Sequence, residues 1–165
     1  MVQAAPMQPL DLGEPHNTGE QQQLHAGTCC YMDASILPER QIIGPTPAGL
    51  GIFVHDPHLP DKKSLIKEQV NEATSPLHAE TFAAQLATQV MKALHYQQCD
   101  YLTDCQLLVN TLQATHPLEK PAHLRLRPLI AEIMSSTETQ SCKFSKISRK
   151  LNKDAHRLAI RMLTD

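Results

Sequence analysis

The chain has 165 residues, which is enough for one domain with a hydrophobic core and short for two. Hydrophobic residues make up 41% and charged residues 19%, which excludes an intrinsically disordered chain, and no apolar run approaches the ~20 residues that span a bilayer. The net charge of −2 neither favours nor excludes nucleic acid as a partner.

Residues 1–27 are predicted to be a flexible tail or linker, because they contain three prolines, a glutamine triplet and few large apolar side chains. This segment lacks the basic and apolar regions of a secretory signal. Five cysteines without a C-x-x-C pair argue against a disulfide framework or a structural zinc site. We therefore expect an intracellular protein whose folded domain spans residues 28–165.

The rest of the chain alternates between strand and helix patterns. Three strand-like segments come first, and strands then alternate with helices, in the order βββαβααβα. Such an order predicts an α/β domain, with a mixed sheet covered by helices. The predicted segments are strands 28–35, 50–56 and 64–71, helix 75–97, strand 99–103, helices 104–113 and 122–137, strand 142–148 and a last helix from Leu151 to Leu163.

Three acidic residues lie where predicted elements begin or end. Asp33 ends the first strand, Asp104 ends the fourth, and Glu80 lies near the start of the long helix. Glu80 shares its helix face with small and apolar residues, so its carboxylate is expected to point inward; these residues are Ala84, Ala87, Met91 and Leu94. Taken singly, each acid is more readily explained as a cap, a turn former or a surface charge. Together they suggest a site for hard divalent ions, which prefer oxygen ligands.

The C-terminal stretch "RKLNKDAHRLAI" is predicted to begin a helix, with Asn152 as its N-cap and Asp154 in its first turn. Basic residues gather around this helix, and they form either a phosphate-binding face or an ordinary solvated surface. Between residues 141 and 165 they are Lys143, Lys146, Arg149, Lys150, Lys153, Arg157 and Arg161, against only Asp154 and Asp165.

Five segments resemble, in order and spacing, the motifs of the ribonuclease H family, and in particular the RNase H-like domain of plant retrotransposon reverse transcriptases. The resemblance covers roughly Thr28 to Leu163 and implies the ribonuclease H-like fold, with a five-stranded mixed sheet flanked by helices. The segments are "MDAS", "AGLGIFVHD", "HAETFAA", "YLTDCQLLVN" and "RKLNKDAHRLA".

The resemblance also implies a set of site residues. The catalytic and metal-binding acids of the family fall on Asp33, Glu80 and Asp104, and the fourth acid of the family falls on His156. Neutral imidazole binds metal ions, so His156 is expected to complete or adjust the site. Asp154 does not replace the missing acid, because two residues along a helix lie ~200° apart. Substrate phosphates are expected to contact Arg149, Lys150 and Lys146.

The activity implied by the resemblance is endonucleolytic cleavage of the RNA strand of an RNA–DNA hybrid, with two Mg²⁺ or Mn²⁺ ions. The implied partners are the hybrid and an upstream reverse transcriptase domain, and we expect a monomer. Two alternatives stay open at this point: a hybrid- or RNA-binding module of the same fold with reduced turnover, and a nuclease that acts on DNA. The presence of all three acids favours the enzyme, because a pure binding module does not need them.

Overall fold

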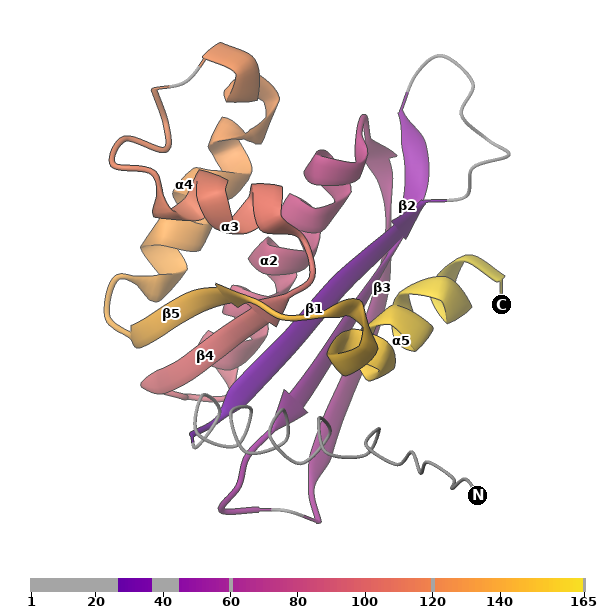
Figure 1. The fold of residues 1–165 in the computed structure, drawn as a ribbon, viewed down its shortest axis with the longest axis vertical. Helices are drawn as coiled ribbons and strands as arrows, with labels where there is room; N and C mark the ends of the chain where they lie inside the picture. The colour runs from indigo at the N-terminus through magenta and orange to yellow at the C-terminus, as the bar shows by residue number, and fades with distance from the viewer. Residues whose placement is uncertain (1–26, 37–44, 60, 120, 165) are drawn as a thin grey trace, which may run out of the picture.

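The computed structural model describes residues 27–36, 45–59, 61–119 and 121–164. The predicted tail, residues 1–27, lies outside this part of the chain except for Gly27. A five-stranded sheet has the strand order β3-β2-β1-β4-β5 (Figure 1). The first three strands are antiparallel, whereas β4 and β5 run parallel to β1, so the predicted mixed sheet is confirmed. The strands are β1 Cys29–Ile36, β2 Thr46–His55, β3 Lys63–Ala73, β4 Gln98–Thr103 and β5 Ser141–Lys146.

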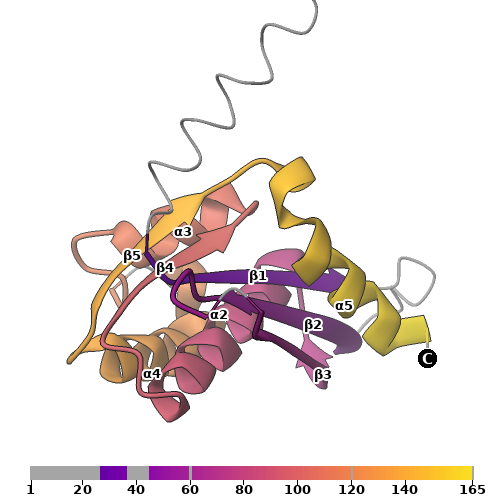
Figure 2. The same ribbon diagram turned by 90° about the horizontal axis from the view of Figure 1, so that it is seen from below.

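Helices cover both faces of the sheet. Figure 2 shows α2 and α4 on one face and α5 on the other. The order βββαβααβα is confirmed, although two short 3₁₀ helices precede α4 and α5 where the sequence predicted continuous α-helix. The helices are α2 Pro76–Ala93, α3 Gln106–Gln113, η3 Pro121–Leu126, α4 Arg127–Thr137, η4 Arg149–Asn152 and α5 Lys153–Thr164.

Helix α2 begins and packs as its sequence predicts. The Ser75 side chain accepts a hydrogen bond from the backbone N–H of His78, and Pro76 occupies the first turn. The face that contains Ala84, Ala87 and Met91 is completely buried against the sheet. The prediction was wrong for Leu94, which lies just beyond the end of the helix and is 45% exposed.

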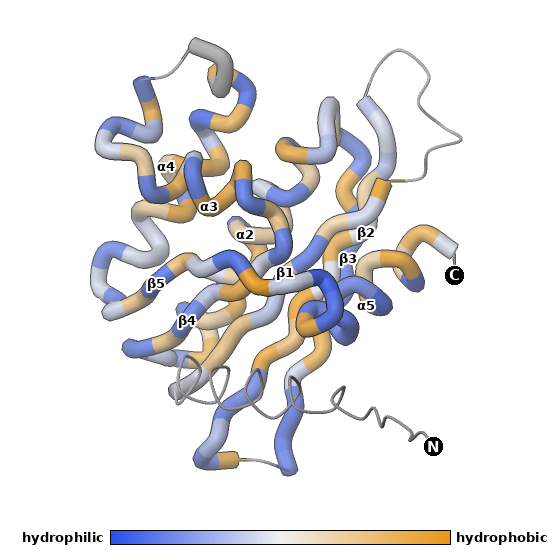
Figure 3. The backbone as a smooth tube through the Cα atoms, viewed as in Figure 1, coloured by the Kyte–Doolittle hydropathy of each residue, from blue (hydrophilic) through white to orange (hydrophobic). Residues whose placement is uncertain are grey.

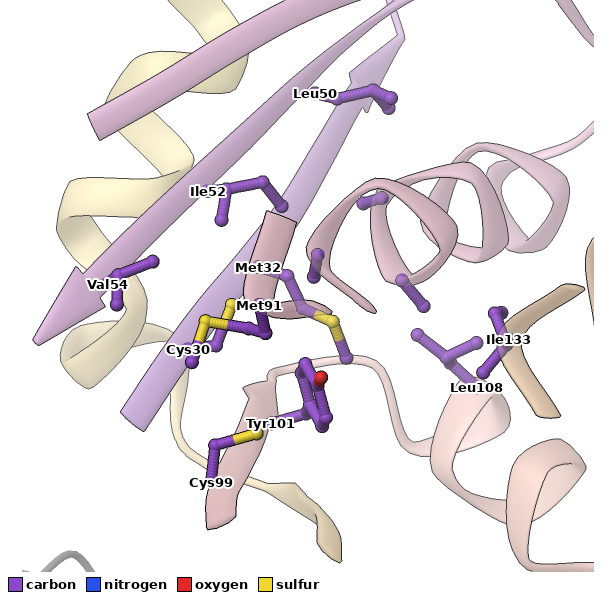
Figure 4. Close-up of a cluster of buried hydrophobic side chains, with 13 residues drawn as sticks. Cys30, Met32, Leu50, Ile52, Val54, Met91, Cys99, Tyr101, Leu108 and Ile133 are labelled. Atoms are coloured by element: carbon purple, nitrogen blue, oxygen red, sulfur yellow. The ribbon is translucent and has the colours of Figure 1, made fainter. Parts of the chain in front are cut away.

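The main hydrophobic core lies between α2 and one face of the sheet. Strand residues that alternate toward this face, such as Met32, Ile52 and Tyr101, meet Met91 of α2 in a cluster rich in sulfur (Figure 4). Along the chain, Figure 3 shows that η4 and the start of α5 are hydrophilic, whereas the second half of α5 contains hydrophobic residues. This core holds α2 against one face of the sheet. The packing of α5 on the opposite face depends on a different kind of contact.

Two glycines of β2 allow α5 to approach the sheet very closely. A Cβ atom at Gly49 would lie 2.0 Å from the carbonyl oxygen of Ala159, and one at Gly51 would lie 2.0 Å from that of Ala155. The backbone of α5 therefore packs directly against β2, and the residues at the contact, Ala155 and Ala159, are completely buried. Gly51 pairs in register with Asp33 of β1, so the helix crosses the sheet beside that acid.

We predict that Gly51→Ala destabilises the domain by about 3 kcal/mol, because the new methyl group meets helix backbone that cannot move without lifting α5 from the sheet. The measurement is urea denaturation followed by circular dichroism. Gly27→Ala is the matched control, since a Cβ there meets nothing within 4 Å. Equal stability of the two variants would show that α5 is not held at this distance.

Candidate functional site

The two aspartates of the candidate site lie where strands β1 and β4 separate. These parallel strands pair over only three residues each, and the last pair is Tyr31 with Leu102. Asp33 and Asp104 each lie two residues beyond that pair. Asp33 itself lies three residues before the end of β1, which continues along β2 to Ile36. What ends before Asp33 is the pairing with β4, and this is sufficient to open a space between the strands.

Glu80 reaches the same space from helix α2. One carboxylate oxygen from each of Asp33, Glu80 and Asp104 lies within 4.8 Å of the other two. Asp33 is only 2% exposed, and the Asp104 side chain is 11% exposed. Glu80 Oε2 and Asp104 Oδ2 are completely buried and have no hydrogen-bond partner among the described residues. The structure thus brings the three predicted acids together.

This arrangement is electrostatically unfavourable without a cation. Burial raises the pKa of Glu80 well above its usual range, and repulsion by Asp33 and Asp104 raises this pKa further. Burial likewise raises the pKa of Asp33, although its hydrogen bond to His156 opposes this shift. Three converging carboxylates, with two buried oxygens that accept no hydrogen bond among the described residues, match the oxygen ligands that Mg²⁺ and Mn²⁺ take, so the residues present fit a divalent ion.

His156 contacts one of these acids. Its Nδ1 atom lies 2.6 Å from Oδ2 of Asp33, and the ring is 36% exposed. The three acids form a mutual group that does not include His156, so the histidine is adjacent to the cluster rather than central to it. Asp154 is not in this group either. It lines a separate cavity of about 200 Å³ together with Tyr31 and Phe53.

Asn152 anchors the start of α5 to the sheet. The prediction that Asn152 is an N-cap was wrong: its amide Nδ2 donates a hydrogen bond of 2.9 Å to the backbone carbonyl of Met32. The side chain is completely buried, and the carbonyl that it contacts belongs to the residue just before Asp33. Asn152 therefore fixes η4 beside the carboxylates, and His156 follows one turn later. The only sequence signal for this anchoring contact was the presence of Asn152 in the segment "RKLNKDAHRLA".

The three predicted substrate-binding residues are all exposed, but only Arg149 has a described contact with the acids. Its Nε atom lies 3.5 Å from Asp104 Oδ2, although the Arg149 side chain is 80% exposed. That oxygen has no hydrogen bond of good geometry, so the contact is an ion pair only. Lys146 lies at the end of β5, and Lys150 lies in η4 beside Arg149.

The five-stranded mixed sheet, with three acids meeting where β1 and β4 separate, defines an α/β protein of the ribonuclease H fold. The family model described as "Reverse transcriptase-like" matches residues 45–162, and the chain belongs to this family. A comparison with curated proteins found no match. Among the described residues, no helix has both the length and the apolar character needed to cross a membrane.

Solved structures share this fold. The N-terminal RNase H domain of a Mycobacterium tuberculosis protein is 19% identical, with a TM-score of 0.66, over 84% of this chain and 94% of the other. LC11-RNase H1, isolated from compost and solved with an RNA/DNA hybrid, is 20% identical with a TM-score of 0.63, over 84% and 99%. The protease-reverse transcriptase of Prototype Foamy Virus is 18% identical with a TM-score of 0.57, over 81% of this chain and 20% of that one.

We predict that Glu80→Gln stabilises the protein at neutral pH in the absence of divalent ions. The pKa of Glu80 is higher in the folded state than in the unfolded state, so protonated Glu80 contributes fully to the stability of the fold below the ordinary glutamate pKa of 4.5. This contribution is lost as pH rises through the folded-state pKa. Glutamine stays neutral throughout. The expected gain is on the order of 1 kcal/mol near pH 7 and close to zero below the ordinary pKa.

The measurement is urea denaturation in a chelator across this pH range. Glu68→Gln is the control, because Glu68 is exposed on β3 and its substitution should change stability little at any pH. A destabilised Glu80→Gln variant at neutral pH would contradict the repulsion described for the three acids.

Proposed function

We propose that the chain is a metal-dependent endoribonuclease that cleaves the RNA strand of RNA–DNA hybrids, and that it is part of, or derived from, a retrotransposon reverse transcriptase. The observation that carries this proposal is the convergence of Asp33, Glu80 and Asp104 with two buried oxygens that accept no hydrogen bond among the described residues. The likeness to an RNase H1 solved with an RNA/DNA hybrid supports the substrate. The likeness to a part of a viral protease-reverse transcriptase supports an upstream reverse transcriptase domain.

In this proposal the three acids hold one or two Mg²⁺ or Mn²⁺ ions. Such ions, when bound, activate a water molecule and stabilise the leaving oxygen of a phosphodiester. Asp33 is oriented by its hydrogen bond to His156, and the backbone before it is held by Asn152. The exposed Arg149 and Lys150 lie in η4, in the segment that leads to His156, where they meet the phosphates of a bound strand.

Recognition of the hybrid is expected to depend on shape rather than on base sequence. The chain contains no tryptophan and only three tyrosines and three phenylalanines, which does not favour a surface for stacking single-stranded bases. Selective cleavage of the RNA strand depends on contacts to 2′-hydroxyl groups, which the minor groove of the duplex displays. A hybrid duplex is therefore a better substrate class for this site than single-stranded RNA.

The second candidate is a hybrid-binding module with reduced turnover. It is favoured by His156, whose imidazole contributes no negative charge where the family resemblance places a fourth acid. The two candidates differ in what the acids do: a binding module keeps its affinity for the hybrid without divalent ions, whereas the enzyme needs them for product. A cleavage assay on RNA–DNA hybrid, double-stranded RNA and DNA, with and without Mg²⁺ or Mn²⁺, separates them.

We predict that Asp104→Asn lowers the rate of hybrid cleavage on the order of 1000-fold, because it removes one ligand charge and almost no volume. The melting temperature should not fall, since the substitution also removes repulsion with Glu80. Asp154→Asn is the matched control, because Asp154 is an acid in the first turn of α5, two residues before His156, but outside the cluster. If Asp154→Asn is the variant that loses activity, the proposed set of ligands is wrong.

We predict that wild-type protein prefers Mn²⁺ to Mg²⁺, and that His156→Asp shifts the preference toward Mg²⁺. The substitution exchanges an imidazole nitrogen for an anionic oxygen next to Asp33, and Mg²⁺ depends more strongly on hard oxygen donors. The measurement is a titration of cleavage rate with each metal for both proteins. An unchanged ratio of the two half-saturating concentrations would exclude a role for His156 in metal selection.

A further inference from the structure

Each of the three clustered acids is compensated in a different way. Asp33 is hydrogen-bonded to His156, and burial together with repulsion by Asp33 and Asp104 raises the pKa of Glu80. Asp104 instead has a cation: Arg149 Nε lies 3.5 Å from its buried Oδ2, which no hydrogen bond satisfies. The positively charged Arg149 side chain therefore contacts one of the oxygens that the proposed function assigns to a metal ion.

We propose that Arg149 is an internal counter-cation of the metal site, which leaves Asp104 when a divalent ion binds and then becomes available to a phosphate of the substrate. This inference rests on the proposed function, because it concerns the same carboxylates. It adds that the metal ion and the Arg149 side chain compete for one oxygen, so that the metal-free site already contains a cation.

The contact has the properties of one that is easily exchanged. The distance of 3.5 Å exceeds the ≈ 2.7–2.9 Å of a charge-assisted hydrogen bond, and the ion pair uses Nε alone. The side chain is 80% exposed, so water solvates most of the guanidinium group and weakens the attraction. The Asp104 side chain, by contrast, is only 11% exposed, so water stabilises its charge less and a nearby positive charge matters more to Asp104 than a negative charge does to Arg149.

Simultaneous binding of both cations to Asp104 is unfavourable. The ligand atoms of the three acids lie within 4.8 Å of one another, so an ion bound among them lies next to Oδ2. A guanidinium group 3.5 Å from the same oxygen would face that ion at short range, where like charges repel strongly in a partly buried site. Once displaced, the planar group can bind a phosphate through two parallel hydrogen bonds.

Calorimetric titration of the full chain with Mn²⁺ and with Mg²⁺ tests the competition without measuring cleavage. Arg149→Gln should tighten divalent-ion binding by about two- to fivefold, as expected for loss of a competing exposed ion pair. Lys150→Gln is the matched control: it removes the same charge from the neighbouring residue of η4, which has no described contact with the acids. Its effect should be clearly smaller, and Arg149→Lys should lie between wild type and Arg149→Gln.

A second measurement follows the guanidinium group directly. The Arg149 Nε–H resonance, assigned by its loss in Arg149→Gln, should shift when Mg²⁺ is added. In Asp104→Asn without metal it should already lie near its position in metal-loaded wild type, because its carboxylate partner is gone. Affinity for an RNA–DNA hybrid in the presence of metal should fall in Arg149→Gln, whereas metal affinity rises.

The outcomes separate the inference from the proposed function. If wild type binds divalent ions but Arg149→Gln and Lys150→Gln change the affinity equally, the charge acts at a distance and the inference is wrong. Weaker metal binding by Arg149→Gln would also overturn it, because Arg149 would then be organising Asp104 for the ion. If none of the proteins binds a divalent ion, the metal site of the proposed function fails and the inference fails with it.

Discussion

The contact between the backbone of α5 and strand β2 is the constraint on which the site depends. Gly49 and Gly51 remove the side chains that would keep the helix at the usual distance, and Ala155 and Ala159 do the same on the other side. Because Gly51 is paired with Asp33, the close approach brings the next helix residue, His156, within hydrogen-bond distance of that acid. A helix held farther away would leave Asp33 buried without its partner.

The opposite face of the sheet supplies the second half of the site through a conventional core. Apolar side chains hold α2 in place, and the helix start then carries Glu80 to the space where β1 and β4 separate. This packing offsets the unfavourable repulsion among the three acids, which raises the pKa of Glu80 while its side chain stays in the site. The three carboxylates therefore lower the stability of the fold where they meet, whereas the apolar core that holds α2 raises it without taking part in the site.

Local patterns were sufficient to predict most of the architecture. Hydrophobic alternation and helix periodicity identified every strand and α-helix of the described residues, and the inward face of α2 identified Glu80 as an acid that points inward. Contacts between distant residues were beyond such patterns. Asn152 looked like an N-cap because its actual partner, the Met32 carbonyl, lies 120 residues away. The space beside Asp33 could not be predicted either, because the end of the pairing between β1 and β4 has no signature in the sequence of β1.

The hydrogen bond between Asp33 and His156 joins residues 123 positions apart, and that between Asn152 and Met32 joins residues almost as distant. Contacts of such long sequence separation form late, because the entropy of closing the intervening loop must be overcome before they contribute. During synthesis, the sheet and α2 precede η4 and α5 along the chain. The hydrogen bonds that η4 and α5 make with β1 therefore form only after these two elements have left the ribosome, so Asp33 is the last of the three acids to gain its full set of contacts.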